Sequence, residues 1–157
     1  MRTFLTILIL FFTFQTWAKA DDIRDFEIEN MSLYDSALNY FSKKKIKNSE
    51  EDYYKDKKYT TATITSPEFK TYQQVQITYK YNDKKFILLD INGIVDKNYQ
   101  ECLEEIKKIS KDFTNLFPNT IKSDLATFPH WQDKSGKSKV TDVIWKFDNG
   151  DVIVLAC

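Results

Sequence analysis

The chain has 157 residues, with 23 basic and 23 acidic side chains. This balance argues against nucleic acid as a partner, because nucleic-acid binding requires a basic surface. One histidine and two cysteines make no recognisable set of metal ligands, so we expect neither a metal nor a cofactor.

Residues 1–20 have the three parts of a secretory signal peptide in order. A basic second residue precedes the apolar run 4–17, and the small-x-small pattern AKA ends the segment. An uncleaved membrane anchor is the alternative, but the apolar run is short for a membrane-spanning helix. We expect cleavage after Ala20, a periplasmic location, and a single globular exported domain over 21–157 that is not stably inserted in the membrane.

Helical and alternating patterns predict the elements in the first half of this domain. Apolar residues at helical spacing behind a capping serine predict a helix over 32–42. A charged segment follows, and residues 58–65, rich in threonine and tyrosine, predict a strand. Strict alternation over 72–81, continued on a return strand at 87–91, predicts a hairpin around an Asn-Asp turn.

The second half contains a long helix and a final hairpin. Apolar residues recur in steps of three and four over 98–117, which predicts a helix, and Pro118 ends it. Residues 119–138 show no clear period. A strand through 143–147 then leads over an Asp-Asn-Gly turn to "DVIVLAC", residues 151–157, which is apolar on both faces and is therefore predicted to be a central strand.

These elements predict the fold class. We expect an α+β fold with an antiparallel sheet of about five strands and two main helices packed on one face. The chain has no internal repeats, no low-complexity tract and no linker. A single hydrophobic core is therefore expected.

Cys102 and Cys157 are the two cysteines of the chain, and in an oxidising compartment such a pair predicts a disulfide. The predicted helix turns Cys102 toward the core, and Cys157 ends an apolar strand, so both are expected in the same core. Two buried, unpaired thiols are the alternative. A redox-active pair would have C-x-x-C spacing, which these two residues lack.

Gly136, Lys137 and Ser138 stand in the order that ends a phosphate-binding loop. Such a loop needs an earlier glycine, and Trp131 occupies that position. The residues after Ser138 also have a strand pattern, so the loop would present no helix N-terminus to a phosphate. We therefore interpret this stretch as a surface loop that leads into a strand.

Aromatic residues make up 15% of the chain, and tyrosine and tryptophan are common where one protein contacts another. From this content we select His130, Trp131, Tyr53 and Tyr54 as candidate residues for contact with a ligand or a partner. His130 is also the candidate for a general base, but no serine or cysteine near it in sequence lies in a nucleophile motif. We expect no catalytic residue.

The runs "ADDIRDFEIENMSLYDSALNYFS" and "DKSGKSKVTDVIWKF", with the terminal "VIVLAC", resemble a family of small uncharacterised exported proteins of marine alphaproteobacteria. Those relatives tend to have glycine at the position of Asn30 and to continue past the last cysteine, so an end at Cys157 would fit a truncated gene product. The resemblance implies export and a common fold, but no activity. The run "MSLYDSALNYF" is also similar to the first helix of small outer-membrane assembly proteins of an inhibitor-like α+β type.

The sequence therefore favours a non-catalytic periplasmic or secreted module that binds an unidentified protein or small molecule. An inhibitor of a secreted hydrolase, or an accessory protein of outer-membrane assembly, is a more specific version. An enzyme that uses His130 is the competing class. A deep pocket with polar groups around His130 would favour an enzyme, whereas an exposed apolar surface would favour binding.

Overall fold

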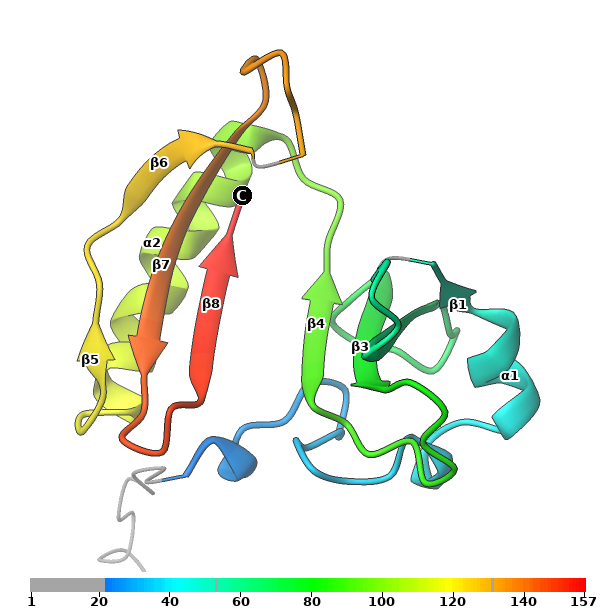
Figure 1. Ribbon diagram of the computed structural model, residues 1–157. Coiled ribbons are helices and arrows are strands. Elements are labelled where there is room, and N and C mark those ends of the chain that lie inside the picture. The colour runs from blue at the N-terminus through cyan, green and yellow to red at the C-terminus, as the bar shows by residue number, and fades with distance from the viewer. Residues whose placement is uncertain (1–21, 53, 131) are drawn as a thin grey trace, which may run out of the picture.

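Two antiparallel sheets organise the fold, as the computed structural model shows for residues 22–52, 54–130 and 132–157 (Figure 1). The strands are β1 (Glu50–Glu51), β2 (Tyr59–Ile64), β3 (Gln74–Lys80), β4 (Asp90–Ile94), β5 (Ile121–Lys122), β6 (Ala126–Pro129), β7 (Lys139–Lys146) and β8 (Val152–Ala156). The helices are α1 (Lys43–Asn48) and α2 (Tyr99–Leu116), and two short 3₁₀ helices span Ile23–Asp25 and Ala37–Asn39.

The first sheet has the strand order β1-β2-β3-β4, and we call residues 34–94, which contain it, the first lobe. Alternation along β3 turns Val75, Ile77 and Tyr79 to one side, where all three are buried. β-branched and aromatic residues suit this half-buried pleated surface. The other buried residues that this lobe gives to the first core are Ala37, Ile46, Ala62, Ile64, Phe86 and Leu88.

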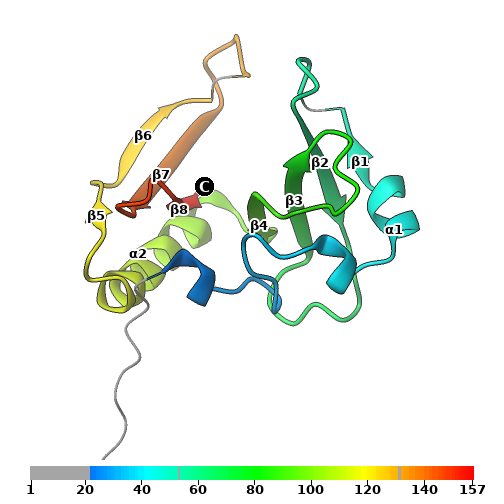
Figure 2. The ribbon, with the colours of Figure 1, turned by 60° about the horizontal axis from the view of Figure 1, so that its bottom comes forward.

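The second sheet belongs to residues 95–157, which we call the second lobe. β7 is its central strand, because β8 pairs along one side of it and β5 and β6 pair along the other. Helix α2 covers one face of this sheet (Figure 2). Asn98 caps the helix by accepting a hydrogen bond from the amide of Glu101 at 3.0 Å. The buried residues of the second core in this lobe are Ile106, Phe117, Val143, Trp145 and Ile153.

Residues 22–33, which we call the connecting segment, pack into both cores. Ile28 and Met31 enter the first core, and Ile23, Phe26 and Leu33 enter the second. The hydroxyl of Tyr34, just after this segment, also donates a hydrogen bond to Oδ1 of Asp151 at 2.9 Å, between the lobes. The two lobes are therefore joined by packing and by a direct polar contact as well as by the chain.

The predicted helix over 32–42 is wrong. The amide of Tyr34 donates to the carbonyl of Leu88 at 2.8 Å, and that of Ala37 donates to the carbonyl of Phe86 at 2.9 Å. These backbone donors bond to a distant loop instead of to the preceding helical turn, and a single 3₁₀ turn remains. A short helix is marginal by itself, so tertiary hydrogen bonds outweigh its propensity. Within the described residues, the fold has one main helix, α2, instead of two.

The predicted sheet is also different from the observed one. The described residues form eight strands in two sheets, whereas the sequence predicted one sheet of about five. The β3–β4 and β7–β8 pairings agree with the predicted hairpins. The last strand, however, is not central: among the described residues β8 pairs with β7 alone, and its Val152 and Val154 side chains are 44% and 46% exposed.

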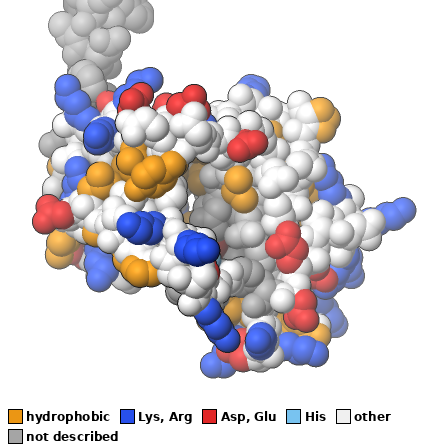
Figure 3. Space-filling model, turned by 90° about the horizontal axis from the view of Figure 1, so that it is seen from above, with side chains coloured by type: hydrophobic (Ala, Val, Ile, Leu, Met, Phe, Trp, Pro, Cys, Tyr) orange, Lys and Arg blue, Asp and Glu red, His pale blue; other side chains and the backbone are white. Residues whose placement is uncertain are grey.

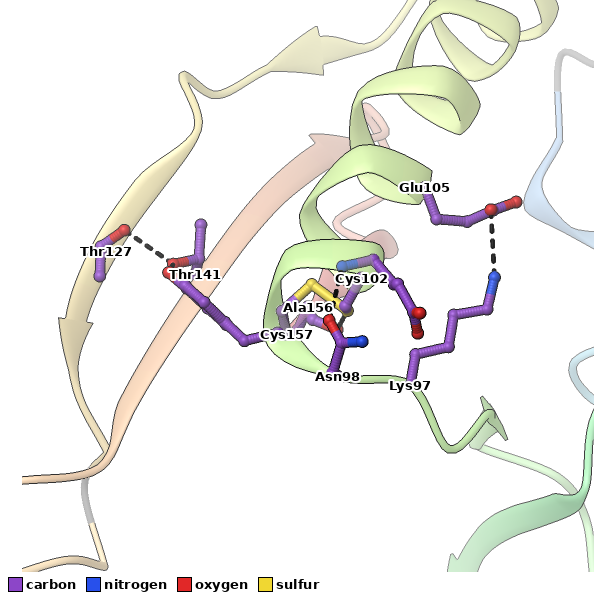
Figure 4. The surroundings of a disulfide bond; sticks show 10 residues. Lys97, Asn98, Cys102, Glu105, Thr127, Thr141, Ala156 and Cys157 are labelled. Carbon is purple, nitrogen blue, oxygen red and sulfur yellow. Dashed lines mark hydrogen bonds and ion pairs between the residues drawn. A yellow bond between two sulfur atoms is a disulfide. The ribbon is translucent and has the colours of Figure 1, made fainter.

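Cys102 and Cys157 form a disulfide with their Cα atoms 5.9 Å apart, in agreement with the predicted pairing (Figure 4). The bond joins the first turn of α2 to the residue that follows β8. It closes a sequence separation of 55 residues. One end of the edge strand β8 is therefore covalently fixed to the helix beneath it.

We expect that the double substitution Cys102→Ser, Cys157→Ser lowers the free energy of unfolding by about 2 to 5 kcal/mol, because the unfolded chain regains the entropy that the cross-link removes. Urea denaturation of the two proteins measures the difference. Reduction of the unaltered protein with dithiothreitol is the matched control and should lower its stability by a similar amount. Equal unfolding midpoints for oxidised protein and double variant would contradict the structure.

Candidate functional site between the two lobes

A cavity of about 410 Å³ lies between the lobes, and we call it the interlobe groove. Strands β4 and β8 stand on either side of it and run in the same direction (Figure 1). Seen from above, side chains of both charges lie on the surface of the two lobes (Figure 3). The apolar floor comes from the connecting segment and α2, with Ile23, Phe26, Ile106, Ile109 and Phe113.

The edge of β8 that borders the groove presents backbone groups that β7 does not use. Thr141 and Cys157 exchange both of their backbone hydrogen bonds, each at 2.9 Å. In an antiparallel pair, positions bonded in this way alternate with positions whose N–H and C=O point away from the partner. The register of β7 and β8 places Val152 and Val154 at these alternate positions, so their backbone groups point away from β7 on the groove side.

The opposite wall, β4, presents a second strand edge. The carbonyl of Ile94 accepts from the amide of Gln73 at 3.0 Å, so Ile94 turns its backbone oxygen toward the β3 side. Alternation then turns the backbone groups of Gly93 and Ile91 toward the groove. The described residues contain no strand that pairs with this edge.

Tyr72 covers Gly93 on this wall. A Cβ built at Gly93 would overlap the Tyr72 ring, so only glycine fits there without a shift of the ring. The Glu29 carboxylate holds the loop before β3 by accepting from the amides of Lys70, Thr71 and Tyr72 at 2.8, 2.6 and 3.0 Å. These hydrogen bonds, that from Lys70 above all, lower the pKa of Glu29.

The rim of the groove is mainly acidic. Its charged side chains are Asp90, Asp151, Glu105 and Lys97. Nζ of Lys97 lies 3.1 Å from Oε2 of Glu105 (Figure 4), and this hydrogen bond lowers the pKa of Glu105. Because Lys97 is paired, Asp90 and Asp151 leave a net negative charge around the opening.

Of the tyrosine and tryptophan residues selected from the sequence, the structure describes Tyr54. Tyr53 and Trp131 lie outside the described residues. Tyr54 is in the loop between β1 and β2, and its ring packs edge-on against Tyr59 with centroids 5.7 Å apart. Tyr54 does not line the interlobe groove.

His130 lies in the loop between β6 and β7, also outside the groove. Its Nδ1 accepts a hydrogen bond from the amide of Gln132 at 3.2 Å, and its own amide donates to the carbonyl of Ser138 at 2.9 Å. Both contacts organise the loop that contains it. The structure therefore brings His130 together with loop backbone and not with the groove carboxylates.

The stretch Gly136-Lys137-Ser138 is in the same loop and leads directly into β7, as the sequence interpretation expected. The Asp133 carboxylate accepts from the amides of Ser135 at 2.8 Å and Ser138 at 2.7 Å. These hydrogen bonds, led by the one with Ser135, strongly lower the pKa of Asp133. The backbone amides of Ser135 and Ser138 in this turn therefore already donate to a carboxylate of the protein itself, where a phosphate-binding loop would donate to a phosphate.

Of the groove residues, the sequence analysis singled out Cys102, as one half of a disulfide, and no residue as a ligand contact. The one signal that points to the groove is the pattern of β8, which is apolar on both faces although the strand lies at an edge. Within the ranges described, no cluster of three His, Cys, Asp or Glu residues is arranged to hold a metal. Comparisons with protein-family models, curated proteins and solved structures found no match.

We expect that Gly93→Ala lowers the free energy of unfolding by about 1 to 3 kcal/mol, because the added methyl group displaces the Tyr72 ring. Urea denaturation measures this cost. In a Tyr72→Ala background the ring is absent, and the same substitution should be neutral or slightly stabilising. An equal loss in both backgrounds would show that the ring is not the cause.

Asp90 should titrate above the ordinary pKa of aspartate. Its Oδ2 accepts from Asn92 Nδ2 at 2.8 Å and Thr78 Oγ1 at 3.2 Å, which favours the carboxylate. Asp90 is an exposed residue, yet the protein atoms around its carboxylate desolvate the charge, and this desolvation outweighs the hydrogen bonds and raises its pKa. NMR titration of the side-chain carboxyl carbon measures the value. An Asp90 pKa at or below 3.8 would contradict this reasoning.

The same titration contains a control. Asp83 accepts from the amides of Ile87 and Lys85, each at 2.9 Å, and these bonds lower its pKa. The ionised Asp83 therefore stabilises the folded protein at pH values above its unfolded pKa. This stabilisation is lost as the pH falls through its folded pKa. Asp90 has the opposite sign: its contribution is present below its unfolded pKa and is lost as the pH rises through its folded pKa. In the variant Asp90→Asn, the free energy of unfolding should therefore no longer show the decrease that Asp90 causes as the pH rises through its folded pKa.

Proposed function

We propose that this protein is a non-catalytic periplasmic or secreted binding module, and that its ligand site is the interlobe groove. The observation that carries the proposal is that β8 has the apolar pattern of a central strand but lies at an edge that borders a cavity. A strand with this pattern normally has neighbours on both sides and cover on both faces. An apolar cavity with a few charged groups at its rim is the usual form of a binding site.

Export is supported by the signal-like pattern of residues 1–20 and by the disulfide, since disulfides persist in oxidising compartments. In the part of the chain that the structure describes, no helix is both long enough and apolar enough to cross a membrane. The edge strands and the apolar floor also suit the more specific function of a hydrolase inhibitor, but no contact distinguishes a hydrolase from another partner.

The two other candidate functions have weaker support. An enzyme that uses His130 would need reacting groups around that side chain, but its Nδ1 accepts from a loop amide and the groove lies elsewhere. The similarity to outer-membrane assembly proteins rested on a helix in the run "MSLYDSALNYF". The chain forms no α-helix there, so that similarity gives no structural support.

A substitution in the groove floor tests the proposal. Ile109 lines the groove and Ile121 does not, being 72% exposed on β5. We expect Ile109→Arg to weaken binding of the neutral apolar fluorophore N-phenyl-1-naphthylamine by about tenfold or more, because a charged side chain then occupies the apolar floor. The matched variant Ile121→Arg should bind as the unaltered protein does. Fluorescence titration measures both.

Circular dichroism checks that the variants are folded. If Ile109→Arg does not fold, Val154→Arg replaces it, because Val154 borders the groove at an exposed position. Equal affinity in the groove variant and in Ile121→Arg would reject the groove as the ligand site. No binding to the unaltered protein would also count against the proposal.

A further inference from the structure

We infer that the ligand of the interlobe groove is an extended segment of another polypeptide, which adds as a strand between β8 and β4. This inference rests on the proposed function and specifies its ligand class. Peptides commonly bind by adding a strand to an exposed sheet edge, where main-chain hydrogen bonds supply affinity and alternate side chains supply specificity. The groove has two such edges, one on each side.

The first observation that supports a peptide ligand is the arrangement of the backbone groups of β8. Val152 and Val154 direct N–H and C=O groups away from β7, and no other strand of the described residues pairs with them. Such groups are a ready template for a further strand. β8 has five residues, which matches the length of an ordinary strand. The turn after β7 fixes one end of β8, and the bond between Cys102 and Cys157 fixes the other. The edge is therefore formed in advance of binding.

The opposite wall adds a second set of main-chain groups. Gly93 and Ile91 of β4 face the groove by alternation from Ile94. A strand between the walls can use its alternate residues to bond to β8 on one side and β4 on the other. Such a strand joins the two sheets into one. A compact apolar molecule fills the same space but leaves both edges unpaired.

The side chains of an added strand also find matching surfaces. Successive side chains of a strand point to opposite faces. One set reaches the floor, where Ile109 and Phe113 of α2 line the groove. The other set lies beside Val152 and Val154, whose exposed side chains are on the face of β8 opposite to α2. The ligand is therefore expected to have apolar residues in alternation.

The rim adds a charge requirement. Asp90 and Asp151 are acidic, whereas Lys97 is already paired with Glu105. A basic residue of the ligand beside Asp90 compensates the charge of a partly desolvated carboxylate. The expected ligand is thus an extended, alternately apolar segment with lysine or arginine among its other positions.

The test uses a mixture of acetylated and amidated peptides of about eight residues, with Val, Ile, Leu or Phe at odd positions and Lys, Arg or Thr at even positions. Binding to the oxidised, ¹⁵N-labelled protein is followed by NMR, together with amide hydrogen exchange. We expect exchange of the Val152 and Val154 amides to slow by about tenfold or more. Exchange of Val75, inside the first sheet, is the internal reference.

Two controls isolate main-chain pairing. The same mixture N-methylated at odd or at even positions keeps its side chains but loses the donors to one wall, so binding should weaken by about tenfold. The variant Val154→Pro removes one N–H of β8 that does not bond to β7, whereas Val154→Ala keeps it. Both variants lose side-chain contact at this position, so the proline variant should weaken binding clearly more than the alanine variant. If it does not fold, the N-methylated peptides still give the answer.

The outcomes separate this inference from the proposed function. If N-phenyl-1-naphthylamine binds in the groove but the peptides do not bind at millimolar concentration, strand addition is rejected and the binding site stands. If neither binds, both fail. Peptide binding without protection of Val152 and Val154, or equal binding of N-methylated peptides, also rejects strand addition. Protection that appears without peptide, together with dimers in sedimentation, assigns the edge to a second copy and overturns the inference.

Discussion

The arrangement of the whole molecule depends on the connecting segment, residues 22–33, which is shared between two hydrophobic cores. Each lobe has its own sheet, and neither sheet bonds to the other in the described residues. Ile28 and Met31 are part of the first core, while Ile23 and Phe26 are part of the second. A polar stretch at this place would remove buried apolar area from both lobes at once. The width of the groove follows from how this segment packs.

Local patterns in the sequence predicted the elements whose hydrogen bonds are local or lie between neighbouring strands. The long helix and the β3–β4 and β7–β8 hairpins belong to this group, because periodicity reports the buried face of an element directly. The pairing of Cys102 with Cys157 could also be predicted, since compartment and burial both favoured it. The helix predicted at 32–42 failed because its amides bond to the distant carbonyls of Phe86 and Leu88.

The candidate site was much less predictable. A strand's own residues do not specify its neighbours, so the pattern of β8 indicated a central position that the strand order does not provide. β5 and β6 escaped prediction because they are short and exposed on every residue, and therefore show no alternation. Several aromatic rings serve the second core. Phe113 meets Phe26 at 5.2 Å and Trp145 at 5.5 Å, in edge-to-face contacts that the composition alone could not distinguish from a binding surface.

The second core has a consequence for the order in which the protein can fold. Ile23, near the start of the described chain, and Ile153, near its end, are buried in the same cluster. That core cannot close until β8 has been synthesised and has joined β7, whereas the sheet of the first lobe needs only residues up to Ile94. Contacts between such distant parts of a chain form slowly and leave apolar surface uncovered in the meantime. As the chain is synthesised, the first lobe is therefore ready to fold while α2 still lacks the sheet on which it packs.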